Sequence, residues 1–170
     1  MRIGIPKEIK NHEYRVGMTP TSVREAVRMG HEVWVETNAG AGIGAADADY
    51  EKAGGKIIPT AAEIFAKADM IVKVKEPQAG ERKMLREGQI LYTYLHLAPD
   101  PEQTKDLVNS GAICIAYETV TSPRGGLPLL APMSQVAGRM SVQSGAHALE
   151  KAQGGRGGLL GGVPGVAPSK

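Results

Sequence analysis

Four ionisable side chains each follow a short apolar run in this sequence, and their types suit the chemistry of a small oxo acid. Arg15 carries a planar guanidinium that pairs with carboxylates, and Lys75 carries an ammonium that can polarise a carbonyl oxygen. His96 carries an imidazole, which exchanges protons near neutral pH, and Glu118 adds a carboxylate. This combination predicts a site where a 2-oxo acid undergoes proton-coupled chemistry at its carbonyl group.

Six apolar runs, which we interpret as β-strands, determine where these side chains lie. Most runs are continuous rather than alternating, as expected for a parallel sheet covered on both faces. Lys75 ends the fourth run, and the other three side chains follow the first, fifth and sixth runs. Open α/β sheets bind ligands beyond the carboxyl ends of their strands. We therefore expect all four on one edge of the sheet. The expected strands are Arg2–Pro6, His31–Glu36, Lys56–Pro59, Met70–Lys75, Ile90–Tyr94 and Ala112–Tyr117.

The stretches between the strands carry the signals that begin and end helices. Thr19, Thr60 and Asp100 stand where N-terminal caps are expected, and Pro20 follows the first of them. We expect Asp47 to cap a short helix as well. Strands that alternate with helices predict an open, doubly wound, mostly parallel α/β sheet.

The pattern changes after residue 131. Residues 132–151 contain no strand signal and predict one helix about 30 Å long. Because the sheet is complete before this helix, we interpret it as a connection between domains or subunits rather than a helix packed on its own domain. Seven of the 22 glycines follow within residues 154–165, and we interpret residues 152–170 as the lead-in to a domain that this chain lacks.

Composition excludes several classes of protein. The chain has 170 residues, of which 42% are hydrophobic and 22% charged, so disorder is not expected. The formal net charge of +2 is too balanced for a protein that binds nucleic acid or a membrane surface. No apolar run approaches the roughly 20 residues that cross a bilayer. The single cysteine, Cys114, excludes an internal disulfide and fits a reducing compartment, so we expect a cytoplasmic protein.

Other motifs are interpreted as structural. The Gly40–Gly44 segment has G-x-G-x-G spacing rather than the G-x-G-x-x-G of dinucleotide sites, so we interpret it as an ordinary flexible turn. Cys114 lies in an apolar run and is expected to be an inert core residue. We expect Lys73 to reach solvent rather than assist the site. The histidines other than His96 lack the spacing of metal ligands, and no metal site is predicted.

Several motifs, spread over essentially the whole chain, resemble those of bacterial alanine dehydrogenases. The matching segments are Arg2–Lys10, Arg15–Val16, Thr19–Pro20, Val72–Pro77, Tyr92–Ala98, Ala116–Val120, Pro132–Ser134, Val136–Met140 and Leu160–Val166. Members of this family interconvert L-alanine with pyruvate and ammonium, use NAD as cofactor, and typically form hexamers. They combine a substrate domain with a Rossmann domain that binds the nicotinamide cofactor.

The resemblance assigns roles to individual residues. It implies that Arg15 and Lys75 bind L-alanine or pyruvate, that His96 is the catalytic acid and base, and that Ser134 contacts NAD. Gln135 departs from the family, which usually has Glu there, so a carboxylate is replaced by an amide. Three further residues are expected to support the site: Tyr94, Glu118 and Met133.

The resemblance also implies a division of the chain. Residues 1–131 correspond to a substrate domain with a Rossmann-like or flavodoxin-like sheet, residues 132–151 to the connecting helix, and residues 152–170 to the start of the NAD-binding domain. The 170 residues alone are therefore expected to be inactive.

Two alternatives remain at this point. The soluble subunit of the proton-pumping nicotinamide nucleotide transhydrogenase shares the opening motif, but the segments Lys75–Pro77 and Tyr94–His96 argue against it. A non-catalytic module that binds a 2-oxo acid would keep the same edge of the sheet and need no cofactor domain.

Overall fold

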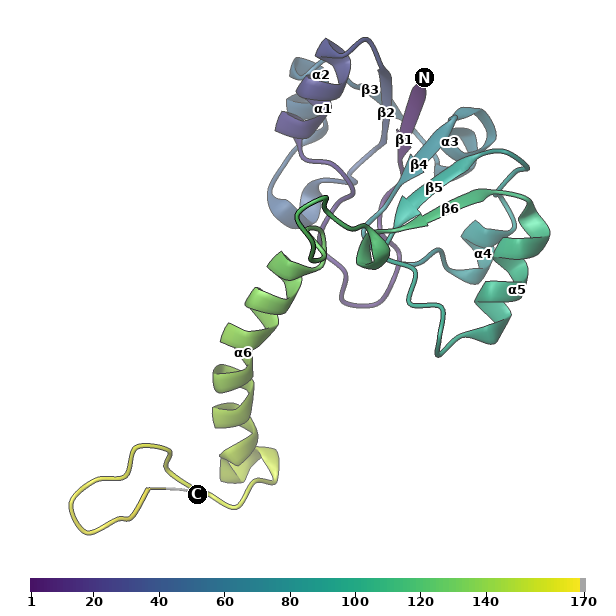
Figure 1. Ribbon diagram of the computed structural model, residues 1–170. Helices are drawn as coiled ribbons and strands as arrows, with labels where there is room; N and C mark the ends of the chain where they lie inside the picture. The colour runs from purple at the N-terminus through teal and green to yellow at the C-terminus, as the bar shows by residue number, and fades with distance from the viewer. Residues whose placement is uncertain (169–170) are drawn as a thin grey trace. The chain divides into compact units, whose positions relative to one another are not determined.

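A computed structural model describes residues 1–168 and divides the chain into two units, Met1–Val120 and Thr121–Lys170. The path of the chain can be followed in Figure 1. The first unit contains the whole β-sheet, and the second contains a long helix and the glycine-rich segment that follows it.

The first unit is built on a six-stranded sheet in which every pair of neighbours is parallel, in the order β3-β2-β1-β4-β5-β6. This confirms the predicted open α/β sheet, and all six expected strands are present. They are up to three residues shorter than expected, chiefly at their carboxyl ends. The strands are β1 (Arg2–Ile5), β2 (Glu32–Glu36), β3 (Lys56–Ile58), β4 (Met70–Val72), β5 (Ile90–Thr93) and β6 (Ile113–Ala116).

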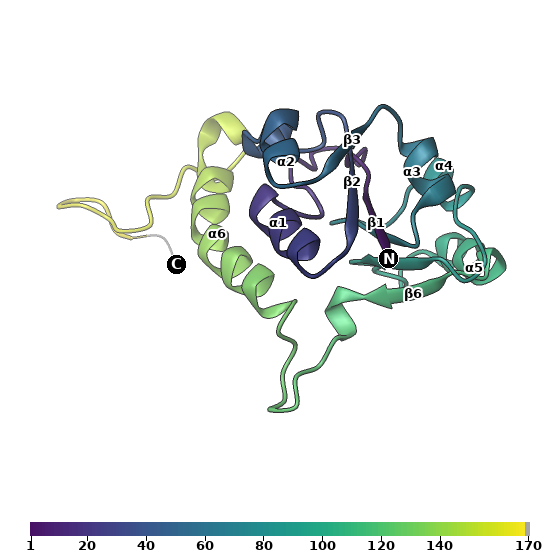
Figure 2. The same cartoon turned by 90° about the horizontal axis from the view of Figure 1, so that it is seen from above.

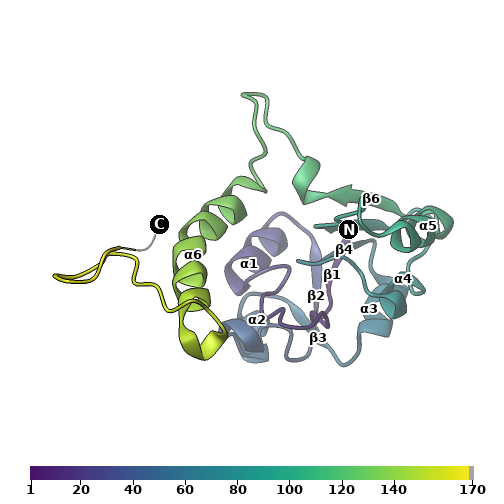
Figure 3. The same cartoon turned by 90° about the horizontal axis from the view of Figure 1, so that it is seen from below.

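Helices cover both faces of this sheet. Figures 2 and 3 show α1 (Pro20–Arg28) and α2 (Asp47–Lys52) on one face, with α3 (Ala61–Lys67), α4 (Ala79–Arg82) and α5 (Pro101–Ser110) on the other. Helices on the two faces of one parallel sheet make the fold doubly wound. Two short 3-10 turns complete the unit: η1 (Ala41–Ile43) and η2 (Tyr117–Thr119).

Three of the four expected helix caps are present. Thr19 Oγ1 accepts a hydrogen bond from the Ser22 amide, and Thr60 and Asp100 accept from the third residue of their own helices in the same way. The expectation for Asp47 is wrong, because Ala46 occupies the cap of α2. The Asp47 carboxylate instead accepts hydrogen bonds from the hydroxyl of Thr37 (2.6 Å) and the amide of Asn38 (2.8 Å), tying α2 to the end of β2.

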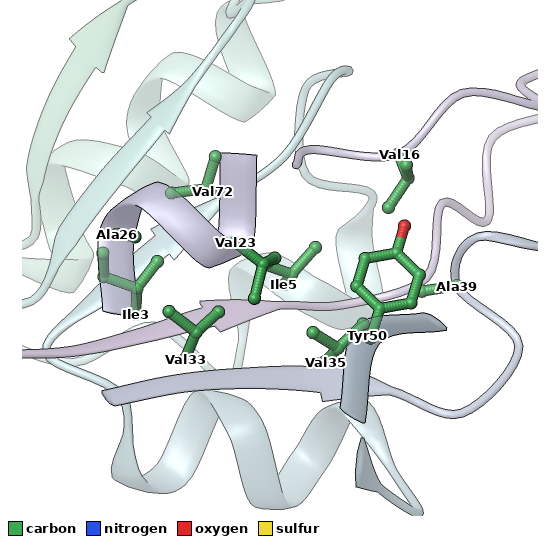
Figure 4. Close-up of a cluster of buried hydrophobic side chains, with 10 residues drawn as sticks. All are labelled: Ile3, Ile5, Val16, Val23, Ala26, Val33, Val35, Ala39, Tyr50 and Val72. Carbon is green, nitrogen blue, oxygen red and sulfur yellow. The ribbon is translucent and has the colours of Figure 1, made fainter. Parts of the chain in front are cut away.

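The two faces of the sheet have separate hydrophobic cores. One lies between the sheet and α1 and α2 (Figure 4) and consists of Ile3, Ile5, Val16, Val23, Ala26, Val33, Val35, Ala39, Tyr50 and Val72. The other lies under α3 and α5 and includes Ile64, Phe65, Ile71, Leu91 and Leu107. Cys114, expected in the core, is only partly buried against this second core, and this burial raises the pKa of its thiol.

The second unit consists mainly of the long helix α6 (Ala131–Leu149), followed by the 3-10 turn η3 (Lys151–Gln153). The helix predicted at residues 132–151 is thus present, displaced by one or two residues at each end. None of the residues of α6 is buried. Between residues 154 and 168, the described part of the glycine-rich segment forms one isolated bridge, between Val163 and Val166. No helix within residues 1–168 is long and apolar enough to cross a membrane.

Candidate active site

The candidate site lies at the carboxyl edge of the sheet, where the strand order reverses between β1 and β4. Parallel strands all end at the same edge, so the segments that follow β1, β4, β5 and β6 emerge there together. These segments are the loop of residues 6–19, called here the first loop, residues 73–78, residues 94–99 and η2. Every candidate residue from the first unit lies in one of them.

Lys75 and His96 line the same pocket. Its volume is about 500 Å³, within the range of small-molecule sites. Lys75 is partly buried, and its Nζ lies 3.9 Å from Oε2 of Glu76, whose other oxygen accepts a hydrogen bond from Lys10. Two ammonium groups, an imidazole and two carboxylates therefore line this space. The lining residues are Lys10, Lys75, Glu76, His96, Pro99, Asp100 and Gln103.

Arg15 lines a second, smaller pocket of about 200 Å³ rather than the one shared by Lys75 and His96. Its Nε and Nη2 donate to the two carboxylate oxygens of Glu13 at 2.8 and 2.6 Å. The geometry is bidentate, the arrangement in which a guanidinium recognises a carboxylate. Arg15 thus holds a carboxylate in this structure, and that carboxylate comes from its own loop.

Electrostatic effects link the two pockets. The hydrogen bond from Arg15 is the main reason that the pKa of Glu13 is lowered, and the charge of Lys75 lowers it further. Burial raises the pKa of Tyr94, while Arg15 acts to lower it and Glu118 to raise it. The Tyr94 ring stacks on His96 with centroids 6.0 Å apart and planes 17° apart. Tyr94 therefore connects the two pockets: it lies within electrostatic range of Arg15 and Glu118, and its ring contacts His96.

Glu118 makes its hydrogen bonds to the backbone of residues 95–96, and the charge of His96 also acts on its carboxylate. Its carboxylate accepts hydrogen bonds from the amides of His96 (2.7 Å) and Leu95 (3.1 Å). Burial would raise the pKa of Glu118, but these backbone bonds outweigh it and the pKa is lowered. His96 has a φ of +48°, a left-handed conformation that non-glycine residues rarely adopt. The bonds to Glu118 thus stabilise a segment in which His96 has an unfavourable backbone conformation, and Gln103 contributes another through the Leu95 carbonyl.

The expectation that Lys73 reaches solvent is wrong. Its side chain is 1% exposed, and its Nζ lies 2.7 Å from Glu81 and 3.3 Å from Glu8. A lysine is buried in this way only when carboxylates surround it. Glu8 and Glu81 were not candidates in the sequence, because nothing in their spacing shows that they meet Lys73.

Two glycines allow the first loop to approach its neighbours closely. A Cβ at Gly42 would lie 2.2 Å from the carbonyl oxygen of Tyr14, the residue before Arg15, and one at Gly17 would lie 2.4 Å from the carbonyl oxygen of Val72. The Gly40–Gly44 segment is a turn, as predicted, but its backbone packs against the loop that carries Arg15. The G-x-G spacing therefore serves close packing.

The remaining candidates belong to the second unit. Met133, Ser134 and Gln135 follow one another in the first turns of α6, and all three side chains are exposed. The Ser134 hydroxyl is therefore accessible to a polar ligand. Among residues 1–168, no group of three or more His, Cys, Asp or Glu side chains is arranged to hold a metal ion.

Comparison with known proteins shows which family the chain belongs to. Residues 4–137 match the family described as "Alanine dehydrogenase/PNT, N-terminal domain". The chain is 61% identical over 170 residues to the alanine dehydrogenase of Halomonas elongata, covering all of this chain and 46% of that protein. Its fold matches a solved L-alanine dehydrogenase with a TM-score of 0.87 at 55% identity, over 99% of this chain and 46% of the other.

A solved transhydrogenase from Sinorhizobium meliloti is less similar. It matches with a TM-score of 0.66 at 32% identity, over 69% of this chain and 35% of the other. The chain thus spans less than half the length of the curated relatives that it matches.

Proposed function

The chain belongs to the family of alanine dehydrogenase/PNT N-terminal domains, and we propose on that basis that it is the substrate-binding part of an NAD-dependent alanine dehydrogenase. The observation that carries this proposal is the pocket shared by Lys75 and His96, with Arg15 on the same edge of the sheet already holding a carboxylate. The names and the identity of the relatives support the same activity.

The proposed reaction consumes L-alanine, NAD⁺ and water and yields pyruvate, ammonium, NADH and a proton. The chemistry supplied by bound NAD is acceptance of a hydride from the α-carbon. Arg15 binds the substrate carboxylate, sharing its guanidinium with Glu13 or displacing it. Lys75 stabilises negative charge on the oxygen that becomes the carbonyl of pyruvate. His96 takes a proton from the attacking water and returns a proton to the departing amine.

Only one residue of this chain, Ser134, is assigned to a contact with NAD. The accessible Ser134 hydroxyl suits a hydrogen bond to a polar group of NAD. The chain contains no G-x-G-x-x-G turn between a strand and a helix, so we assign most of the cofactor site to residues outside it.

Assembly into a hexamer in the cytoplasm is also proposed. The resemblance suggests the hexamer, and the exposed apolar residues Val136, Met140 and Val142 of α6 are suited to contacts with other subunits. The balanced net charge and the single cysteine support the compartment.

A titration of the isolated chain with pyruvate, followed by NMR, tests the binding step. We expect millimolar or tighter binding with shifts at residues 73–76 and 94–96, and weaker binding by Arg15→Lys because the planar fork is lost. Arg28→Lys is the matched control, since Arg28 pairs with Glu25 on α1 away from the site. Equal affinities for wild type and Arg15→Lys would contradict carboxylate recognition by Arg15.

Turnover distinguishes the alternatives. A chimera in which this chain replaces the matching segment of the Halomonas elongata alanine dehydrogenase should oxidise L-alanine with NAD⁺. Its His96→Ala variant should lose kcat while retaining most of its affinity for pyruvate. A chimera that folds and binds pyruvate without turnover would favour the non-catalytic binding module instead.

A further inference from the structure

A buried cluster of three charged side chains lies beneath the candidate site. Glu8, from the first loop, and Glu81, from α4, flank the ammonium of Lys73, and the three side chains are between 1% and 4% exposed. Burying charges without partners is strongly unfavourable, so these groups must be held together by their mutual contacts.

Glu8 also reaches the backbone next to Lys75. Its Oε1 accepts a hydrogen bond of 2.6 Å from the amide of Val74, a residue 66 positions later in the chain. The carbonyl of Val74 accepts from the amide of Tyr94, and the carbonyl of Lys75 accepts from the hydroxyl of Thr93. The segment that carries Lys75 is therefore tied on one side to the end of β5 and on the other to Glu8.

The bond from Glu8 replaces one that the sheet cannot supply. Strand β1 pairs with β4 only as far as Gly4 and Ile71, and beyond Ile5 the chain leaves the sheet at Pro6. Gly17 then brings the same loop back against the Val72 carbonyl. Glu8 and Gly17 thus fix the first loop to the extension of β4 at two points.

We propose that Glu8 is a positioning residue, which holds the Lys75 segment at a set distance from the loop that carries Arg15 and so prepares the site for a small 2-oxo acid. This inference rests on the proposed function. Glu8 does not line the pocket of Lys75 and His96, and it reaches the Lys75 segment through the Val74 amide. It does line the smaller pocket that contains Arg15. Burial raises the pKa of Glu8, but either protonation state retains an oxygen that accepts from this amide.

Three substitutions separate the hydrogen bond from the charge. Glu8→Ala removes both, Glu8→Asp keeps the charge but withdraws the carboxylate by one methylene, and Glu8→Gln keeps an acceptor oxygen at full length. We expect pyruvate to bind about tenfold more weakly to Glu8→Ala and Glu8→Asp, as for the loss of one hydrogen bond of ordinary strength. Glu8→Gln should restore most of the affinity.

Amide hydrogen exchange measured without pyruvate tests the hydrogen bond between the Val74 amide and Glu8 directly. The Val74 amide should exchange at least tenfold faster in Glu8→Ala and Glu8→Asp than in wild type, and near the wild-type rate in Glu8→Gln. The Lys73 amide, which donates to Tyr92, is the internal control and should stay protected in every variant that folds. Glu81→Gln is the matched control, because it touches Lys73 but not Val74.

The outcomes separate this proposal from the proposed function. If wild type does not bind pyruvate, the proposed function fails, whereas the exchange data still decide whether Glu8 holds Val74. Fast exchange of Val74 in wild type would overturn the positioning role. So would unchanged pyruvate affinity in Glu8→Asp, the variant that keeps the buried charge if Glu8→Ala fails to fold.

Discussion

Two histidines in this chain have a positive φ, and only one of them lines the candidate pocket. His96 has φ +48° and His12 has φ +58°. A left-handed backbone costs a residue with a Cβ about 1–2 kcal/mol, whereas glycine adopts it without that cost. Glycine loses about 0.5–1 kcal/mol more conformational entropy on folding than alanine does. At each position we therefore expect the Gly variant to be about 0.5–1 kcal/mol more stable than the Ala variant.

Comparing Gly with Ala cancels the loss of the side chain. His96 stacks on Tyr94, and Nδ1 of His12 lies 3.1 Å from the hydroxyl of Tyr14, so both substitutions at a position remove the same contact. The assay is urea denaturation of the isolated chain at pH 7, followed by circular dichroism. Equal stability of the Gly and Ala variants at residue 96, or higher stability of Ala, would refute the argument that the backbone there is strained.

Activity should separate the two positions. In the chimera with the Halomonas elongata enzyme, both His96 variants should lose turnover, while both His12 variants should retain it, because His12 lines neither the pocket of Lys75 and His96 nor that of Arg15. Loss of turnover at residue 96 alone would show that only one of the two histidines with a left-handed backbone belongs to the site.

Three further predictions concern the groups around the site and the edge of the sheet. Glu118→Ala should lower the free energy of unfolding, measured by urea denaturation, by about 1–3 kcal/mol. This is less than the loss of two buried charged hydrogen bonds would cost, because the carboxylate is partly exposed, and Glu118→Gln should lower it by less. Gly42→Ala should destabilise by about 1–3 kcal/mol through its clash with Tyr14, whereas Gly80→Ala, with nothing within 4 Å, should not. Hydrogen bonds from Lys56, Trp34 and Arg2 lower the pKa of Glu32 from 4.5 to about 2. Its contribution to stability should be complete above pH 4.5 and fall as the pH drops toward 2, and Glu32→Gln should flatten that part of the pH–stability curve measured by urea denaturation.

Much of the fold could be predicted because its signals are local. Continuous apolar runs indicate strands buried on both faces, and a cap such as Thr19 or Asp100 satisfies amides within three residues of itself. The prediction from local signals was wrong for a side chain that bonds a distant partner instead of a nearby amide. Asp47 stands where a cap is expected, yet its carboxylate binds the end of β2, ten residues earlier.

The edge on which the candidate residues lie was also predictable. Parallel strands end at one edge, so the residue that follows each strand must lie there. The strand order, with β1 beside β4, was not predictable from these signals and placed the first loop against the Lys75 segment.

The sequence alone therefore determined the elements, the parallel sheet and the edge that carries Arg15, Lys75, His96 and Glu118, because these depend on patterns within a few residues. Only the tertiary structure decided which groups each side chain meets. Glu118 makes its hydrogen bonds to backbone amides that follow β5, and Lys73 is buried between Glu8 and Glu81. Such contacts join segments up to 66 residues apart. Burying a charged side chain is favourable only when its partners are next to it, and here the sheet brings them together.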